Sequence, residues 1–159
     1  PGTRIGFEAG VGLEKTGVVG FAGRRAVSML RVLFREAARA DADTLVRACL
    51  AQRGVEVFHN SQGVEGLCLL LIAKQDALHA ACDEVRRLLP GAQVKLRENL
   101  AALLALCRTT REVPKLAAAM ESAGVPVHHL VQTPPGALFC VNDSQYETAL
   151  RAAYALAFG

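Results

Sequence analysis

A short pattern occurs twice in the chain and constrains the fold more than any other feature. Each copy follows an amphipathic helical segment and reads Gly-Val-x-Val, first at Gly54 and again at Gly124. The copies lie about 70 residues apart, which is the size of one small α+β module. The chain of 159 residues therefore reads as two copies of one fold.

The hydrophobic pattern of the first copy predicts strand, helix, strand, strand, helix, strand. Asp41 or Asp43 is a natural N-cap for the first of these helices, and Gly54 is its stop. The second copy repeats the order up to its second helix. The predicted strands are 27–34, 54–58, 64–72, 93–96, 100–107, 124–132 and 137–141, and the predicted helices are 43–52, 76–89, 111–123 and 145–157.

This order is that of a ferredoxin-like α+β sandwich, in which both helices cover one face of an antiparallel sheet. The second copy lacks its fourth strand, whereas an apolar segment at 17–22 is left over at the other end of the chain. Pairing this segment with 100–107 is the simplest cover for the bare sheet edge. We therefore predict an α+β fold of two ferredoxin-like βαββαβ modules, the first inserted into the second. The first module spans 25–97, and the second spans 17–24 plus 98–159.

Composition excludes several functional classes. The net charge is +3 and aromatic residues make up 5% of the chain, so no phosphate-tracking patch or base-stacking platform for nucleic acid is visible. The five cysteines are isolated in the sequence, which predicts buried thiols in a reducing cytoplasm rather than a metal or redox motif. The longest apolar run is too short to span a membrane. We expect no cofactor and no metal.

Two polar stretches remain open to interpretation. The segment His59–Gly63 separates two apolar strands, and it is either a solvated hairpin turn or a place where a ligand binds. His128 and His129 are adjacent in a predicted strand, so they should point to opposite faces. This predicts one core and one exposed histidine rather than a chelating pair.

Several stretches resemble the tandem ACT domains that form the regulatory region of aspartokinases. Residues 1–5, Pro-Gly-Thr-Arg-Ile, are similar to the stretch just after that family's kinase domain. Residues 121–127 are similar to its E-A-G-I-N-I segment, and residues 149–158 to its terminal A-V-R-A-L-H-x-A-F segment. The resemblance covers nearly the whole chain and is carried by the order and spacing of these segments.

The resemblance implies a regulatory domain or subunit of an aspartokinase, which senses an end-product amino acid of the lysine or threonine type and mediates dimerisation. The catalytic domain is absent, so the chain by itself should not be an enzyme, and residues 1–16 should be the linker after that domain. The implied partners are a second copy of the chain, an aspartokinase catalytic domain or subunit, and a small amino-acid effector in the cytoplasm. Nucleic acid and membrane are not expected as partners.

The family's effector pocket uses the loop after the first strand, the start of the next helix, and the second strand with its turn. Gln62 falls where the family has a glutamine, Thr133 falls on a hydroxyl residue, and Phe58 replaces the family's aspartate. In the implied site, side-chain oxygens near Gln62 hold the ammonium, and N–H groups near Asp43 hold the carboxylate. The implied effector-binding residues are Asp41, Asp43, Phe58, Asn60, Ser61, Gln62 and Thr133.

The replaced aspartate keeps a second function open. A module that has lost effector binding would remain a ligand-free ACT dimerisation module. Phe58 favours that alternative, whereas Ser61 and Gln62 favour the sensor.

Overall fold

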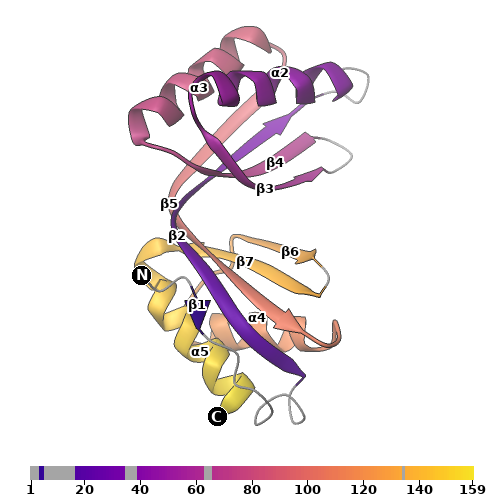
Figure 1. Ribbon diagram of the computed structural model, residues 1–159, viewed down its shortest axis with the longest axis vertical. Helices are drawn as coiled ribbons and strands as arrows, with labels where there is room; N and C mark the ends of the chain where they lie inside the picture. The colour runs from indigo at the N-terminus through magenta and orange to yellow at the C-terminus, as the bar shows by residue number, and fades with distance from the viewer. Residues whose placement is uncertain (1–3, 6–16, 35–38, 63–65, 134) are drawn as a thin grey trace. The chain divides into compact units, whose positions relative to one another are not determined.

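Two long strands, β2 (Val18–Leu33) and β5 (Gln93–Cys107), are hydrogen-bonded neighbours at the centre of the strand order (Figure 1). The computed structural model describes residues 4–5, 17–34, 39–62, 66–133 and 135–159. Its contacts divide the chain into two units, and both long strands contribute to each of them. We call Val27–Glu98 the insert unit, and Pro1–Ala26 together with Asn99–Gly159 the terminal unit.

The module boundaries expected from the sequence, 25–97 for the first module and 17–24 plus 98–159 for the second, stay a prediction. The contact-based division of the structure falls after Ala26 and after Glu98. The predicted linker, residues 1–16, lies outside the described residues except for β1 (Arg4–Ile5). This strand pairs with β2 at Phe21 and Ala22.

The insert unit is a sheet covered on one face by two helices (Figure 1). Its strands follow the order β3 (Glu56–Gln62), β4 (Gly66–Ile72), β2 and β5, and β4 is antiparallel to both β3 and β2. The helices are α2 (Arg39–Gln52) and α3 (Gln75–Leu88). The predicted ferredoxin-like βαββαβ arrangement is confirmed.

The sequence of α3 shows why this layer packs as it does. Leu78, Ala81, Cys82 and Val85 are buried, and their spacing of three and four residues places them on one helical face. That face packs against the sheet residues whose side chains point toward the helices, and these are alternate residues because alternate strand residues share one face. The sheet contributes Leu30, Val32, Leu67, Leu69 and Leu71 to this core.

The terminal unit repeats the arrangement with residues from both ends of the described chain. Its strand order is β2, β5, β7 (Gly136–Asn142) and β6 (His129–Thr133). The helices are α4 (Glu112–Ser122) and α5 (Tyr146–Phe158), and the short helix η2 (Asp143–Gln145) leads into α5. The predicted pairing of 17–22 with 100–107 is confirmed, since β2 adjoins β5 and the Arg108 N–H donates to the Gly17 carbonyl at 2.7 Å. The core gathers Val18, Phe21, Ala101, Leu103, Leu116, Met120, Phe139 and Ala153, among others.

The repeated glycines end their helices in the same way. Gly54 and Gly124 have φ angles of 71° and 84°, a conformation that favours glycine. In both copies the N–H of the following valine reaches back to the helix at 3.0 Å, from Val55 to the Leu50 carbonyl and from Val125 to the Met120 carbonyl. The internal repeat predicted from these positions is therefore present in the backbone.

The two hairpins also share one register. Gln62 pairs with Leu67 in the insert unit, and Gln132 pairs with Ala137 in the terminal unit. Gly66 and Gly136 open the second strand of each hairpin, and each is packed against a backbone carbonyl of the neighbouring strand. A shift of 70 residues therefore converts one hairpin into the other.

Two strands are longer than the sequence predicts. We expected separate segments at 17–22 and 27–34, and at 93–96 and 100–107, but β2 and β5 each run through without a break. Each strand accommodates one left-handed residue, Ala26 with φ 57° and Asn99 with φ 58°. The strand geometry departs from the extended form at these two residues, and each strand continues on either side of its left-handed residue.

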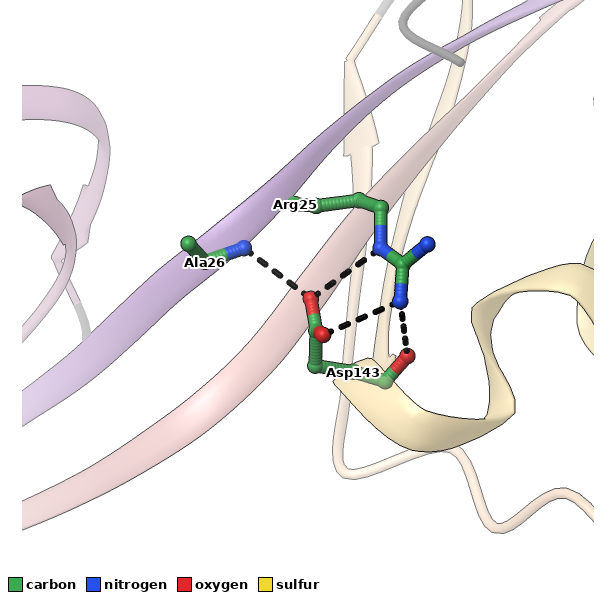
Figure 2. Close-up of polar contacts among 3 residues, drawn as sticks. All are labelled: Arg25, Ala26 and Asp143. Carbon is green, nitrogen blue, oxygen red and sulfur yellow. Dashed lines mark hydrogen bonds and ion pairs between the residues drawn. The ribbon is translucent and has the colours of Figure 1, made fainter. Parts of the chain in front are cut away.

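Asp143 fixes the backbone at Ala26 (Figure 2). Its carboxylate accepts the Ala26 N–H at 3.0 Å and also pairs with the Arg25 guanidinium at 3.1 Å. Burial alone would raise the pKa of Asp143, but the Ala26 N–H and the Arg25 guanidinium outweigh it and keep the pKa below its usual value. This contact ties the start of η2 and α5 to β2.

Candidate functional site

The predicted helix-start residues lie inside α2 rather than at its N-cap. The helix begins at Arg39, so Asp41 is in its first turn and Asp43 follows. Asp43 accepts a hydrogen bond from Arg47 Nε at 2.8 Å, which is an ion pair four residues apart on the helix. The N-cap prediction is wrong, because acidic residues are stabilised throughout the first turn and do not fix the first residue of a helix.

The predicted hairpin turn at His59–Gly63 is also displaced. His59, Asn60, Ser61 and Gln62 belong to β3 and pair with β4 from Leu70 to Leu67, whereas residues 63–65 lie outside the described residues. The apolar strand β4 offers a continuous row of backbone partners. Its ladder hydrogen bonds outweigh the turn preference of Asn60 and Ser61.

The predicted residues of β3 do not share one face. Phe58 lies where the register shifts between Val57 and His59, and 37% of its surface is exposed. Asn60 and Ser61 are consecutive, so they point to opposite faces of the sheet. Ser61 lies opposite Cys68, whose pKa is raised by burial despite its contacts with Arg31 and Ser61.

Thr133 belongs to the terminal unit and ends β6 opposite Gly136. Its neighbour Gln132 points to the other face of β6, where it lines a cavity of about 170 Å³. We call this the terminal cavity. The predicted residue Thr133 is therefore not among the described lining residues, whereas its neighbour Gln132 is. Its lining includes Cys107, Arg108, Thr109, Thr110, Gln132 and Gly136.

The terminal cavity lies where β5 ends and α4 begins. The backbone N–H of Arg108 is bonded to Gly17, which holds the residues after β5 against the start of β2. No side chain caps the first turn of α4. Among the described residues, no side-chain hydrogen bond or ion pair occupies Arg108, Thr109, Thr110 or Gln132. All four residues line the terminal cavity, and their side chains carry a guanidinium, two hydroxyls and an amide.

The residues that are described in the lining include no Asp or Glu. Burial raises the pKa of the Cys107 thiol, and the nearby Glu112 raises it further, so this thiol is neutral at pH 7. The Glu112 side chain lies beside Gly17 instead of lining the cavity. Among the described lining residues, Arg108 alone carries a full charge, and that charge is positive.

A larger cavity, of about 360 Å³, lies in the insert unit and has an apolar lining. It lies between the end of β2, the first turn of α2 and the turn after α3. Among the described residues that line it there is no charged side chain, and none of the predicted effector-binding residues is among them. Its lining includes Phe34, Ala42, Leu88, Leu89, Pro90 and Ala92.

The two adjacent histidines do not divide into a core and an exposed residue. Both are half-buried, and His128 lies just before β6 rather than within it. His128 Nε2 is 2.8 Å from Asn142 Oδ1, and Asn142 also donates to Gln145 at 3.0 Å. This polar chain explains the burial of His128. In the described part of the chain, no group of three His, Cys, Asp or Glu side chains is placed to hold a metal ion.

Arg108, Thr109, Thr110 and Gln132 were missed by sequence reasoning. The internal repeat carries the signal that would have found one of them, because Gln132 lies 70 residues after Gln62 and has the same pairing register. The loop after β5 gives no comparable signal. Its residues are ordinary turn formers and are brought to Gln132 only by the fold.

Comparisons with protein-family models and with curated protein sequences find no match. The fold has clear relatives among solved structures. Clostridium acetobutylicum aspartate kinase matches with a TM-score of 0.74 and 17% identity, over 89% of this chain and 35% of the kinase. The regulatory subunit of aspartate kinase from Thermus flavus matches with a TM-score of 0.71 and 21% identity, over 87% of this chain and 97% of the subunit.

The chain has the fold of an aspartate kinase regulatory domain. Aspartokinase III from E. coli, in a structure with lysine and aspartate, matches with a TM-score of 0.67 and 15% identity, over 90% of this chain and 34% of that chain. The chain thus spans about a third of the longer kinases and nearly all of the Thermus flavus regulatory subunit. The Thermus flavus protein that is matched over 97% of its length is described as a regulatory subunit of aspartate kinase. In the described ranges, no helix is both long and apolar enough to cross a membrane.

Proposed function

We propose that the chain is the regulatory part of an aspartate kinase, and that it binds an amino acid and passes this signal to a catalytic domain in the cytoplasm. The observation that supports this most is the match over nearly the whole length of a separate regulatory subunit. The match covers 87% of this chain, so it includes most of both units. An effector acts in this scheme by binding one conformation more tightly than another.

The effector is an end-product amino acid of the lysine or threonine type. Lysine was bound in the structure of E. coli aspartokinase III, but Phe58 here stands where the family resemblance implies a carboxylate. A charge-assisted hydrogen bond is worth about 1.5 to 3 kcal/mol. Its absence should weaken lysine binding by roughly ten- to a hundredfold at a site built on β3.

The chain also forms a homodimer in this proposal. β3 and β6 stand at the ends of the strand order, so the outer edge of each has no strand partner among the described residues. Leu130 in β6 is 40% exposed. Edge strands and exposed apolar residues are features that proteins cover by association.

The test is a calorimetric and thermal-shift screen of lysine, threonine, serine, methionine and the branched-chain amino acids at millimolar concentration. Sedimentation of the same samples at tens of micromolar measures the oligomeric state. We expect one amino acid to raise the melting temperature of a dimer. A well-folded dimer that binds no amino acid would instead support the ligand-free dimerisation module. A monomer would contradict both the dimeric sensor and the dimerisation module.

A further inference from the structure

We propose that Ala26 and Asn99 form a paired hinge between the insert unit and the terminal unit, and that Asp143 is the lock on one side of it. The chain passes from one unit to the other at two places, between Ala26 and Val27 and between Glu98 and Asn99. The hinge acts whether or not the chain binds an amino acid, so its test is independent of the proposed sensing function.

The backbone conformation singles out the same two places. Among the described residues, Ala26 (φ 57°) and Asn99 (φ 58°) are the non-glycine residues with a positive φ angle. The contacts that divide the chain into units and the φ angle of a residue are separate properties, yet each crossing falls beside a left-handed residue. A left-handed conformation costs an L-residue free energy, and such strain clusters at functional sites and switch regions. Both long strands therefore depart from the extended form where they change unit.

The two hinge positions are equivalent in the internal repeat. Each directly precedes a buried residue, Val27 or Leu100, that opens the first strand segment of one unit. The part of the same strand that comes before the hinge is the fourth strand of the other unit, 18–26 of β2 in the terminal unit and 93–98 of β5 in the insert unit. Each hinge residue therefore lies where one continuous strand changes its role.

Asp143 holds the hinge at Ala26 (Figure 2). Its Oδ1 atom accepts the Ala26 N–H at 3.0 Å, and its Oδ2 atom accepts from Nη2 of Arg25 at 3.1 Å. The same Nη2 atom donates to the Asp143 main-chain carbonyl at 3.2 Å, and the guanidinium carbon lies 5.4 Å from the centre of the Tyr146 ring. A strained residue persists only where its surroundings hold it. The groups that hold Ala26 come from η2 and the start of α5, within the terminal unit.

The second crossing needs less support. Asparagine tolerates the left-handed conformation better than alanine does. Its neighbour Glu98 places Oε2 at 2.8 Å from Nε2 of His79 in α3, which ties β5 to the insert unit one residue before the hinge. Loss of the Asp143 contacts would release Ala26 toward the extended conformation, and β2 would change direction between the units. A signal acts on such a hinge when a ligand or partner binds one of its conformations more tightly than the other.

The experiment measures residual dipolar couplings of the backbone amides by NMR on the full chain, and fits the alignment tensor of each unit separately. The variants are Asp143→Ala, which removes the lock, and Asp143→Asn, which keeps an oxygen for the Ala26 N–H but removes the charge. Asp83→Ala is the matched control, because Asp83 forms an aspartate–arginine pair with Arg86 inside α3 of the insert unit. Amide exchange at Ala26 reports on the hydrogen bond itself.

We expect one alignment tensor to fit both units in the unmodified chain and in Asp83→Ala. Asp143→Ala should need two different tensors, and Asp143→Asn should show a smaller difference of the same kind. Exchange of the Ala26 N–H should be roughly five- to tenfold faster in Asp143→Ala, as expected for the loss of one hydrogen bond.

A single tensor for Asp143→Ala, together with faster exchange at Ala26, would overturn the hinge, because Ala26 would then be a rigid irregularity of β2. Two tensors already in the unmodified chain, or unchanged exchange at Ala26 in Asp143→Ala, would overturn the lock. If Asp143→Ala does not fold, the comparison of tensors in Asp143→Asn decides between the same outcomes.

Discussion

Gly136 occupies a position where the fold leaves no room for a side chain. It opens β7 directly opposite Leu106 of β5, and it also lines the terminal cavity. A Cβ atom at this position would lie 1.8 Å from the carbonyl oxygen of Ala105, although real contacts of this kind almost never fall below 3.0 Å. That oxygen belongs to the backbone and cannot rotate away, so Gly136→Ala must push the ends of β5 and β7 apart.

The expected cost follows from this geometry. Forcing an extra methyl group into a packed site typically costs about 1 to 3 kcal/mol, and each strand hydrogen bond that is broken adds about 0.5 to 1.5 kcal/mol. We expect Gly136→Ala to lower the free energy of unfolding by about 2 to 4 kcal/mol. Gly66→Ala should cost a similar amount in the insert unit, because its Cβ would lie 2.0 Å from the Val32 carbonyl oxygen.

The assay is equilibrium unfolding in urea, followed by circular dichroism, with amide exchange to locate the loosened strands. Gly91→Ala is the matched control, since a Cβ there meets nothing within 4 Å and should change the stability by less than about 0.5 kcal/mol. If Gly136→Ala is as stable as Gly91→Ala, the close pairing of β5 with β7 at this register is not a feature of the folded chain.

Three further predictions concern individual residues. Asp143→Ala should cost about 1 kcal/mol through loss of the Ala26 N–H bond. The pKa of Asp143 is lowered on folding, so the stability that its carboxylate contributes is fully present above about pH 4 and is lost as the pH falls through the folded-state pKa. Urea unfolding of the unmodified chain and of Asp143→Ala should therefore show a smaller difference in stability at pH 3 than at pH 7. Gly124→Ala should cost about 1 kcal/mol by thermal unfolding, because φ is 84° while the Cβ itself has open space. At pH 8, a thiol reagent should label the half-buried Cys68 before Cys82, whose pKa burial raises to about 11, and equal labelling by mass spectrometry would contradict the packing of α3.

Most of the features that sequence reasoning predicted have local causes. Gly54 and Gly124 each end a helix through hydrogen bonds to residues a few positions earlier, so the pattern alone reveals the repeat. The buried face of α3 likewise follows from residues spaced three and four apart. Both signals arise within one turn or one helix and need no knowledge of distant parts of the chain.

The features that sequence reasoning missed depend on distant partners. Ala26 lies between the separate strands predicted at 17–22 and 27–34, yet β2 continues through it, and Asp143, 117 residues away, accepts its N–H. The four residues His59–Gln62 read as a turn, yet β4 holds them in a strand. The terminal cavity is lined by both Arg108 and Gln132, and nothing in the sequence near either residue shows that the fold places them at the same cavity.

The way β2 is shared between the two units has a consequence for synthesis on the ribosome. The insert unit is one continuous stretch and can close as soon as Glu98 has emerged, whereas Val18 and Phe21 precede it in the chain and have their core partners in β5 and later elements. At about 5 to 20 residues per second, these apolar side chains wait several seconds for those partners to be made. Val18 and Phe21 are thus buried later than residues made after them, and during that interval they are exposed to chaperones and to misassociation between nascent chains.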